Sequence, residues 1–127
     1  MILVDSTIYI DWLRGRVEPL GVLEPWVQTH SAFTCGVIRA EVVRGVLDAH
    51  QKIRTHELFD LLQDIPTDAR LWVEASELAW TLDRQGVVIP LTDVVIAACA
   101  RRAAATVITT DNHFSRIPGL SVRATVT

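Results

Sequence analysis

The chain has 127 residues, of which 50% are hydrophobic and 21% are charged, and its formal net charge at pH 7 is −3. These values predict one globular domain over residues 1–127 with a sizeable core, and the acidic balance argues mildly against a nucleic-acid partner, which favours a basic surface. The longest mostly apolar stretch, residues 86–105, contains a proline, an aspartate and two arginines, which excludes a membrane span.

The N-terminal residues and the two cysteines both indicate in which compartment the protein is found. The chain begins with a short apolar run that an acid ends, MILVD, which lacks the basic and long apolar regions of a secretory signal. Cys35 and Cys99 are isolated, without the spacing of a zinc or redox motif. We therefore expect a cytoplasmic protein with two buried free thiols.

Short apolar runs alternate with helical patterns along the first half of the chain. The elements expected there are a strand at 2–5, a helix capped by Ser6 or Thr7 and ended by Gly15, a helix at 20–28 that Pro25 interrupts, a strand at 31–36 and a helix at 36–47. The first strand is the most apolar of these elements, which predicts that it is buried.

The second half continues the alternation. The elements expected there are a helix at 50–62, an extended piece at 64–67, a helix capped by Asp68 and ended by Gly86, a strand at 87–90, a helix at 91–103, and strands at 105–110 and 120–126. Trp72 and Trp80 are eight residues apart on one helical stripe, so we expect them in the core.

Strands that alternate with helices predict an α/β fold in which helices cover both faces of a mostly parallel sheet. The architecture inferred is a three-layer α/β/α sandwich. In open sheets of this kind, ligands bind at the carboxyl ends of the strands. Residues that directly follow the strands are therefore the candidates for function.

Three aspartates follow predicted strands. Asp5 directly follows the apolar residues ILV of the first strand, Asp111 follows the strand at 105–110, and Asp93 comes shortly after the strand at 87–90. Aspartate is common in turns, which would explain any one of them. Three at one sheet edge would repel one another, and this repulsion favours a site that binds a cation.

The segment LTDVVIAACA raises its own question, because an apolar helix is normally buried and an unpaired carboxylate at its start is costly. Negative charge at a helix N-terminus is favourable, which is the simplest explanation of Asp93. Thr92, however, offers a capping hydroxyl, which would leave Asp93 free for another role.

A fourth acid, Glu41, shares a helix face with Val37 and Ile38. An ion pair with Arg44 is the alternative explanation, but it does not account for a glutamate inside an apolar stripe. Aspartate and glutamate without histidine or cysteine form a hard-oxygen site suited to Mg²⁺ or Mn²⁺. Such an ion can hold phosphate oxygens and activate water, so the chemistry implied is phosphodiester hydrolysis.

The remaining histidines and arginines carry weaker signals. The four histidines lack metal-ligand spacing and are expected on the surface or in loops, although one of them closely follows Asp111; they are His30, His50, His56 and His113. Five arginines are candidate RNA contacts near the acidic edge, although each is more often a solvated charge; they are Arg14, Arg16, Arg101, Arg102 and Arg116.

Four segments, VDSTIYIDWLRG, IRAEVVRG, LTDVVIAACA and VITTDNHF, together resemble the PIN-domain ribonucleases, and more narrowly the VapC toxins of bacterial toxin–antitoxin systems. The resemblance spans nearly the whole chain in order. It implies a metal-dependent endoribonuclease that uses Mg²⁺ or Mn²⁺, a homodimer, a cognate VapB-type antitoxin that blocks the site, and a structured RNA target such as tRNA or rRNA.

The same resemblance assigns roles to six residues. The four acidic positions of the family fall on Asp5, Glu41, Asp93 and Asp111, with Asp5 and Asp93 as the direct metal ligands. Ser6 and Thr110 match polar positions that support the acids or the substrate.

Several alternatives remain at this stage. A haloacid-dehalogenase-type phosphatase would need an aspartate at Thr7, and a response-regulator receiver would need a late lysine, whereas Lys52 is the only lysine. A PIN nuclease that acts in ribosomal RNA maturation is a further alternative, which the sequence alone separates poorly from a toxin. A PIN-like fold kept only for protein binding would be favoured by loss of an acid, and none is lost.

Overall fold

The computed structural model describes all 127 residues and contains a five-stranded, all-parallel sheet with the order β3-β2-β1-β4-β5. The strands are β1 (Ile2–Val4), β2 (Ala32–Cys35), β3 (Gln63–Ile65), β4 (Thr106–Ile108) and β5 (Val122–Arg123). The predicted α/β class is confirmed, and β1 lies at the centre of the sheet.

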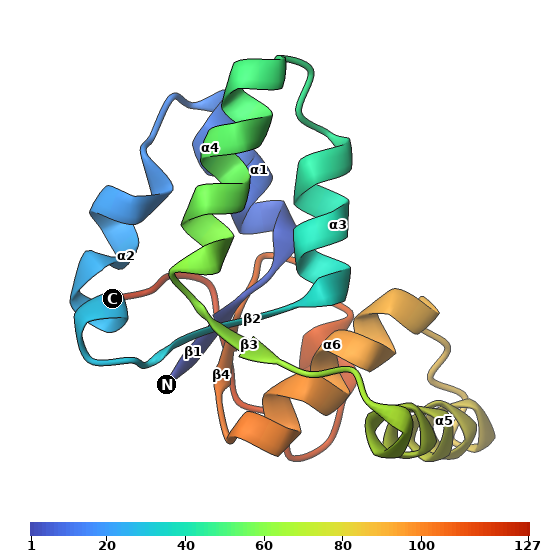
Figure 1. Cartoon of the computed structure of the whole chain (residues 1–127). Coiled ribbons are helices and arrows are strands. Elements are labelled where there is room, and N and C mark those ends of the chain that lie inside the picture. The colour runs from blue at the N-terminus through green and yellow to red at the C-terminus, as the bar shows by residue number, and fades with distance from the viewer.

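Helices cover both faces of the sheet. They are α1 (Ser6–Arg14), α2 (Pro19–Gln28), α3 (Gly36–Arg44), α4 (Ala49–Asp60), α5 (Ala69–Arg84), α6 (Leu91–Ala103) and a short 3-10 helix, η1 (Phe114–Arg116). Figure 1 shows α1, α3 and α4 above the sheet and α5 and α6 below it, which gives the three layers expected from the sequence. No helix is long and apolar enough to cross a membrane.

The most deeply buried elements of the core are β1 and α6. All three residues of β1 are buried, as a central strand between two helical layers requires. In α6 every residue from Asp93 to Ala100 is buried, and the alanines of this helix let it pack closely on the sheet. Cys35 and Cys99 are free and buried, as predicted.

The strand predicted at residues 87–90 is wrong. These residues are an irregular connection between α5 and α6, in which Val88 is 71% exposed. Gly86 has a φ of 77°, which ends α5, and Pro90 has no N–H to donate to a sheet and instead precedes the first turn of α6. The apolar run anchors the connection through Ile89, which is only 9% exposed.

Two predicted helix caps are also wrong, and one is right. α1 begins after Asp5 and α6 after Pro90, and neither has a side-chain cap hydrogen bond, so Ser6, Thr7 and Thr92 do not cap. Asp68 does cap α5, because its carboxylate accepts a 2.9 Å hydrogen bond from the N–H of Leu71.

Trp72 and Trp80 are not in the core; their exposed fractions are 46% and 60%. The buried stripe of α5 is the neighbouring one, formed by Leu71, Ala75, Leu78 and Leu82. Both stripes have helical spacing, and the packing of α5 on α6 selects the aliphatic one. The Arg84 guanidinium lies 4.8 Å from the centre of the Trp80 ring and partly covers it.

Candidate active site at the carboxyl edge of the sheet

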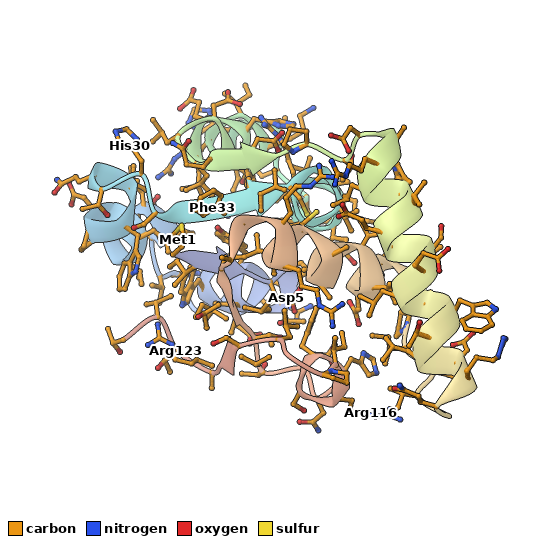
Figure 2. The ribbon with its side chains drawn as sticks, turned by 90° about the horizontal axis from the view of Figure 1, so that it is seen from below. Met1, Asp5, His30, Phe33, Arg116 and Arg123 are labelled. Atoms are coloured by element: carbon orange, nitrogen blue, oxygen red, sulfur yellow. The ribbon has the colours of Figure 1, made fainter.

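Asp5 is the most deeply buried acid of the site, with an exposed fraction of 2%. Its backbone N–H donates to the carbonyl of Ile108, so the residue is still held against β4 as the chain turns into α1. Its Oδ2 accepts two 2.9 Å hydrogen bonds, from the hydroxyls of Thr7 and Thr109. Figure 2 shows Asp5 in the interior of the molecule, where these two donors offset the cost of burying its charge.

Asp111 lies on the loop that follows β4 and is tied to the same threonine. Its backbone N–H donates to Oγ1 of Thr109 at 2.9 Å. Its own Oδ1 accepts from the backbone N–H of His113 at 2.9 Å, which closes a tight turn of the loop. This turn places the His113 ring over the acids, with Nδ1 3.1 Å from Oδ1 of Asp111.

Asp93 reaches the site from the first turn of α6. Its Oδ2 lies 2.8 Å from Nδ1 of His113. Burial raises the pKa of Asp93, and the negative charges of Asp111 and Asp5 raise it further, against the opposing effect of the His113 hydrogen bond. The position of the carboxylate in the site is therefore electrostatically costly, as the repulsion argument from the sequence predicted.

Glu41 enters the site from α3, in the opposite helical layer. Its Oε1 accepts a hydrogen bond from the hydroxyl of Ser6 at 3.2 Å. Burial raises the pKa of Glu41, the Ser6 hydrogen bond lowers it, and the charges of Asp5 and Asp93 raise it. Arg44 forms no ion pair with Glu41, so the alternative explanation offered for this glutamate does not hold.

The structure thus brings the four sequence-predicted acids to one edge of the sheet. One ligand atom each from Asp93, Asp111 and His113 lie within 4.8 Å of one another. Asp5 and Glu41 lie outside this group of three, although the negative charge of Asp5 raises the pKa of both Asp93 and Glu41. Carboxylate oxygens are the ligands that hard divalent cations prefer, so the residues present fit Mg²⁺ or Mn²⁺.

Of the two polar residues expected to support the acids, Ser6 contacts one of them and Thr110 does not. Ser6 contacts an acid, because its hydroxyl donates to Glu41. Thr110 is exposed and its side chain makes no hydrogen bond within the protein, whereas Thr109, one residue earlier, contacts both Asp5 and Asp111. The register pairs Val4 with Ile108 and so places Asp5 beside Thr109. Knowledge of that strand pairing is the signal that would have found Thr109.

The sequence analysis also undervalued His113, whose ring lies within the acidic cluster. The other histidines lie elsewhere, as expected. His30 and His50 are exposed, and His56 accepts a hydrogen bond from Arg39. No signal beyond the closeness of His113 to Asp111 in the sequence separated it from the rest.

Most of the arginines expected near the acidic edge either contact other residues or lie away from the acids. Arg102 pairs with Asp68, and Arg101 donates to the carbonyl of Pro118. Arg14 ends α1, whereas the site lies at the start of that helix, and Arg16 lies beyond it. Arg116, in η1 directly after the acidic loop, lies at the edge of the molecule in Figure 2 and remains a candidate contact for an anionic ligand.

Carboxylates at the carboxyl edge of a parallel sheet are typical of sites for metal-assisted chemistry on phosphate esters. The PIN domain family model matches residues 2–120, so the chain belongs to the PIN domain family. The nuclease activity predicted from the sequence is the activity of that family. No curated protein sequence matches this chain.

Solved structures share the fold over the whole chain. VapBC2 from Rickettsia felis, bound to a promoter DNA fragment, has 23% identity and a TM-score of 0.78 over 97% of this chain and 98% of the other. DNA-bound VapBC from Salmonella typhimurium has 20% identity and a TM-score of 0.78 over 96% of each chain. A toxin–antitoxin complex from Klebsiella pneumoniae has 28% identity and a TM-score of 0.67 over 94% of this chain and 95% of the other.

Proposed function

We propose that this protein is the toxin of a toxin–antitoxin pair and acts as a divalent-metal-dependent endoribonuclease. The observation that supports the proposal is the close grouping of Asp93 and Asp111 with His113, together with the electrostatic coupling of Asp93 to Asp5 and Glu41. Family membership supports nuclease chemistry, and the similarity to VapBC complexes supports the toxin role. A structured RNA such as tRNA or rRNA is the proposed substrate.

Within this proposal Asp5 and Asp93 are the direct ligands of Mg²⁺ or Mn²⁺, and Glu41 and Asp111 complete the site directly or through water. The bound ion supplies positive charge for the phosphate oxygens and lowers the pKa of the attacking water. The hydroxyls of Thr7 and Thr109 hold Asp5 in one rotamer, and Ser6 does the same for Glu41.

Glu41 is the proposed proton acceptor in the reaction. A carboxylate that water can reach and that a neighbouring hydroxyl holds in place can accept a proton from that water. Its Oε1 is held by Ser6, and its half-buried position on α3 lets it face the cluster while remaining accessible to water. Arg116 is the proposed contact for a substrate phosphate.

The proposed inhibitor is a short antitoxin segment that places a basic side chain in the acidic pocket. An arginine pairs with two carboxylate oxygens at once and can neutralise the cluster without a metal. The similar structure from Klebsiella pneumoniae is a toxin–antitoxin complex, which supports a partner of this kind. Two buried free thiols suit the reducing cytoplasm that we propose as the location.

The decisive test is cleavage mapping of total RNA with purified protein in Mg²⁺ and in Mn²⁺. Asp93→Asn should lower cleavage by orders of magnitude, because a neutral amide is a poor ligand for a hard cation. Asp83→Asn is the matched control, since Asp83 is an exposed aspartate on α5. Cleavage by Asp93→Asn at the wild-type rate would contradict the proposal.

Cleavage mapping, expression of the protein without a partner and inspection of the neighbouring gene together separate the alternatives. A PIN nuclease of RNA processing would cut a precursor RNA at one maturation site and would not arrest growth when expressed without a partner. A protein-binding module would cut no RNA under any metal condition. A small gene immediately upstream that encodes the inhibitor would decide in favour of the toxin.

A further inference from the structure

We infer that His113 is itself a ligand of the divalent ion, and that its nitrogen shifts the preference of the site from Mg²⁺ toward Mn²⁺. This inference rests on the proposed function, because it concerns the ion bound at that same site. It adds a nitrogen donor to a site that the sequence predicts to be all oxygen.

The position of the His113 ring is the first argument. Nδ1 lies 2.8 Å from Oδ2 of Asp93 and 3.1 Å from Oδ1 of Asp111. Two neighbouring ligands of an octahedral ion that is 2.0–2.1 Å from each lie roughly 3 Å apart. The two pairs that include Nδ1 therefore already have the separation of adjacent ligands of one ion, and the ligand atoms of all three residues lie within 4.8 Å of one another.

The fixation of His113 is the second argument. Its backbone N–H donates to Asp111 at 2.9 Å, and the next residue, Phe114, is fully buried in the core. The ring is consequently held over the carboxylates from both sides along the chain. Its side chain is 38% exposed, so water and an ion can reach the nitrogen from solvent.

The chemistry of the donor set decides the choice of ion. Mg²⁺ binds oxygen ligands almost exclusively, whereas imidazole nitrogen suits later divalent metals. Mn²⁺ shares the preference of Mg²⁺ for carboxylate oxygen, but as a first-row transition ion it binds imidazole nitrogen more readily than Mg²⁺ does. A site with one imidazole among carboxylates should therefore favour Mn²⁺ more strongly than the same site without it.

A purely electrostatic role is the competing explanation. His113 could only neutralise Asp93 and Asp111 by hydrogen bonding, as it does in the structure. In that case its nitrogen would leave the cluster when an ion enters. The two explanations differ in one measurable respect, which is whether a histidine nitrogen is bonded to the bound ion.

Electron spin echo envelope modulation of the protein loaded with one equivalent of Mn²⁺ tests this directly. We expect nitrogen modulation in the wild type and in His50→Asn, because His50 is exposed on α4 and outside the site. We expect it to be absent in His113→Asn, whose amide oxygen can replace Nδ1 as a ligand. Labelling the wild type with ¹⁵N-histidine should change the modulation frequencies, and this measurement does not depend on a variant that folds.

Competition titrations of Mn²⁺ against Mg²⁺ give the second readout. The ratio of Mn²⁺ to Mg²⁺ affinity should fall by about tenfold or more in His113→Asn, within the range seen when groups around a metal are removed. It should remain unchanged in His50→Asn.

The outcomes distinguish this inference from the proposed function. If Mn²⁺ binds the wild type but not Asp93→Asn, and the wild type shows no nitrogen modulation, then His113 is not a ligand. The proposed metal site is retained in that case. If Mn²⁺ does not bind the wild type, or binds Asp93→Asn equally well, both the role of His113 and the proposed metal site are wrong. Nitrogen modulation that His113→Asn abolishes supports both.

Discussion

The hydroxyl of Thr109 lies 2.9 Å from Oδ2 of Asp5 and joins residues 104 positions apart in the sequence. The same hydroxyl accepts a hydrogen bond from the N–H of Asp111. Thr109 therefore fixes two acids of the site relative to each other, one at the end of β1 and one beyond the end of β4. This link depends on the pairing of those two neighbouring strands.

Thr109→Val is predicted to weaken both the fold and the site. The valine keeps the shape of threonine but removes a donor to the buried Asp5 and an acceptor for the N–H of Asp111, which should cost about 1–3 kcal/mol of unfolding free energy. Cleavage of RNA should fall by about 10–100-fold, as for other groups that orient metal ligands. Denaturant unfolding and a cleavage assay on one preparation measure both effects.

Thr110→Val is the matched control, because Thr110 is exposed and makes no hydrogen bond through its side chain. It should leave stability within about 0.5 kcal/mol of the wild type, as is usual for surface positions. If Thr110→Val reduced cleavage while Thr109→Val did not, the role that the sequence assigned to Thr110 would be restored.

This threonine pair shows where prediction from the sequence stops. Both residues follow an apolar strand, and nothing local distinguishes the one that faces Asp5 from the one that faces solvent. The distinction is set by strand register, since a shift of one residue reverses the direction of every side chain. Register is a tertiary property, and the short strand β4 carries too few residues to reveal it.

Asp93 gives a different lesson, because it lies beside His113 and Asp111 although part of the reasoning that selected it is wrong. The strand expected before it does not exist, and the first turn of α6 delivers its carboxylate to the site. The argument from repulsion survived, since it depends on charge and not on the element that carries the charge. Burial of α6, predicted from its unbroken apolar pattern, is confirmed.

The exposed face of α5 is predicted to contact a second copy of the chain. Trp72, Val73 and Trp80 lie on this face with exposed fractions of 46%, 61% and 60%, and large exposed aromatic groups are typical of interfaces. Trp80→Glu should therefore convert a homodimer to a monomer, as measured by light scattering at micromolar concentration. Ile53→Glu, on α4 in the opposite layer, should leave the oligomeric state unchanged. A wild type that is already monomeric contradicts this prediction.

Inhibition by the antitoxin segment is predicted to depend on the charge of the acidic pocket. If an arginine of the partner pairs with these carboxylates, Asp111→Asn should weaken binding of the co-purified partner by about 2–5 kcal/mol, as for a buried charge pair that loses one member. Asp83→Asn, which removes the same charge from the surface of α5, should change it little. Calorimetric titration measures the difference. A partner that binds Asp111→Asn as tightly as the wild type, or leaves ribonuclease activity unchanged, rules out this mode of inhibition.

The last prediction concerns stability and pH in protein freed of metal by a chelator. The pKa of Asp93 is raised above 3.8 in the folded protein, so between 3.8 and the raised value the folded state binds more protons than the unfolded state. Stability must therefore fall as pH rises through that window. Asp93→Asn cannot ionise and lacks this loss.

We expect the unfolding free energy of Asp93→Asn to decrease less than that of the wild type between pH 4 and pH 7, so that the variant gains relative stability as pH rises. If Asp93 served only to complement the helix dipole, the result would be the reverse, with the variant less stable at neutral pH by about 1 kcal/mol or less. Addition of Mn²⁺ at pH 7 should then stabilise the wild type by about 2.7 kcal/mol at a hundred times its dissociation constant, because the ion binds only the folded state. The variant should gain much less, since it lacks one of the two proposed direct ligands. Thermal or denaturant unfolding of both proteins, with chelator and with Mn²⁺, tests this in one series, and equal stabilisation of the two proteins by the ion would remove Asp93 from the metal site.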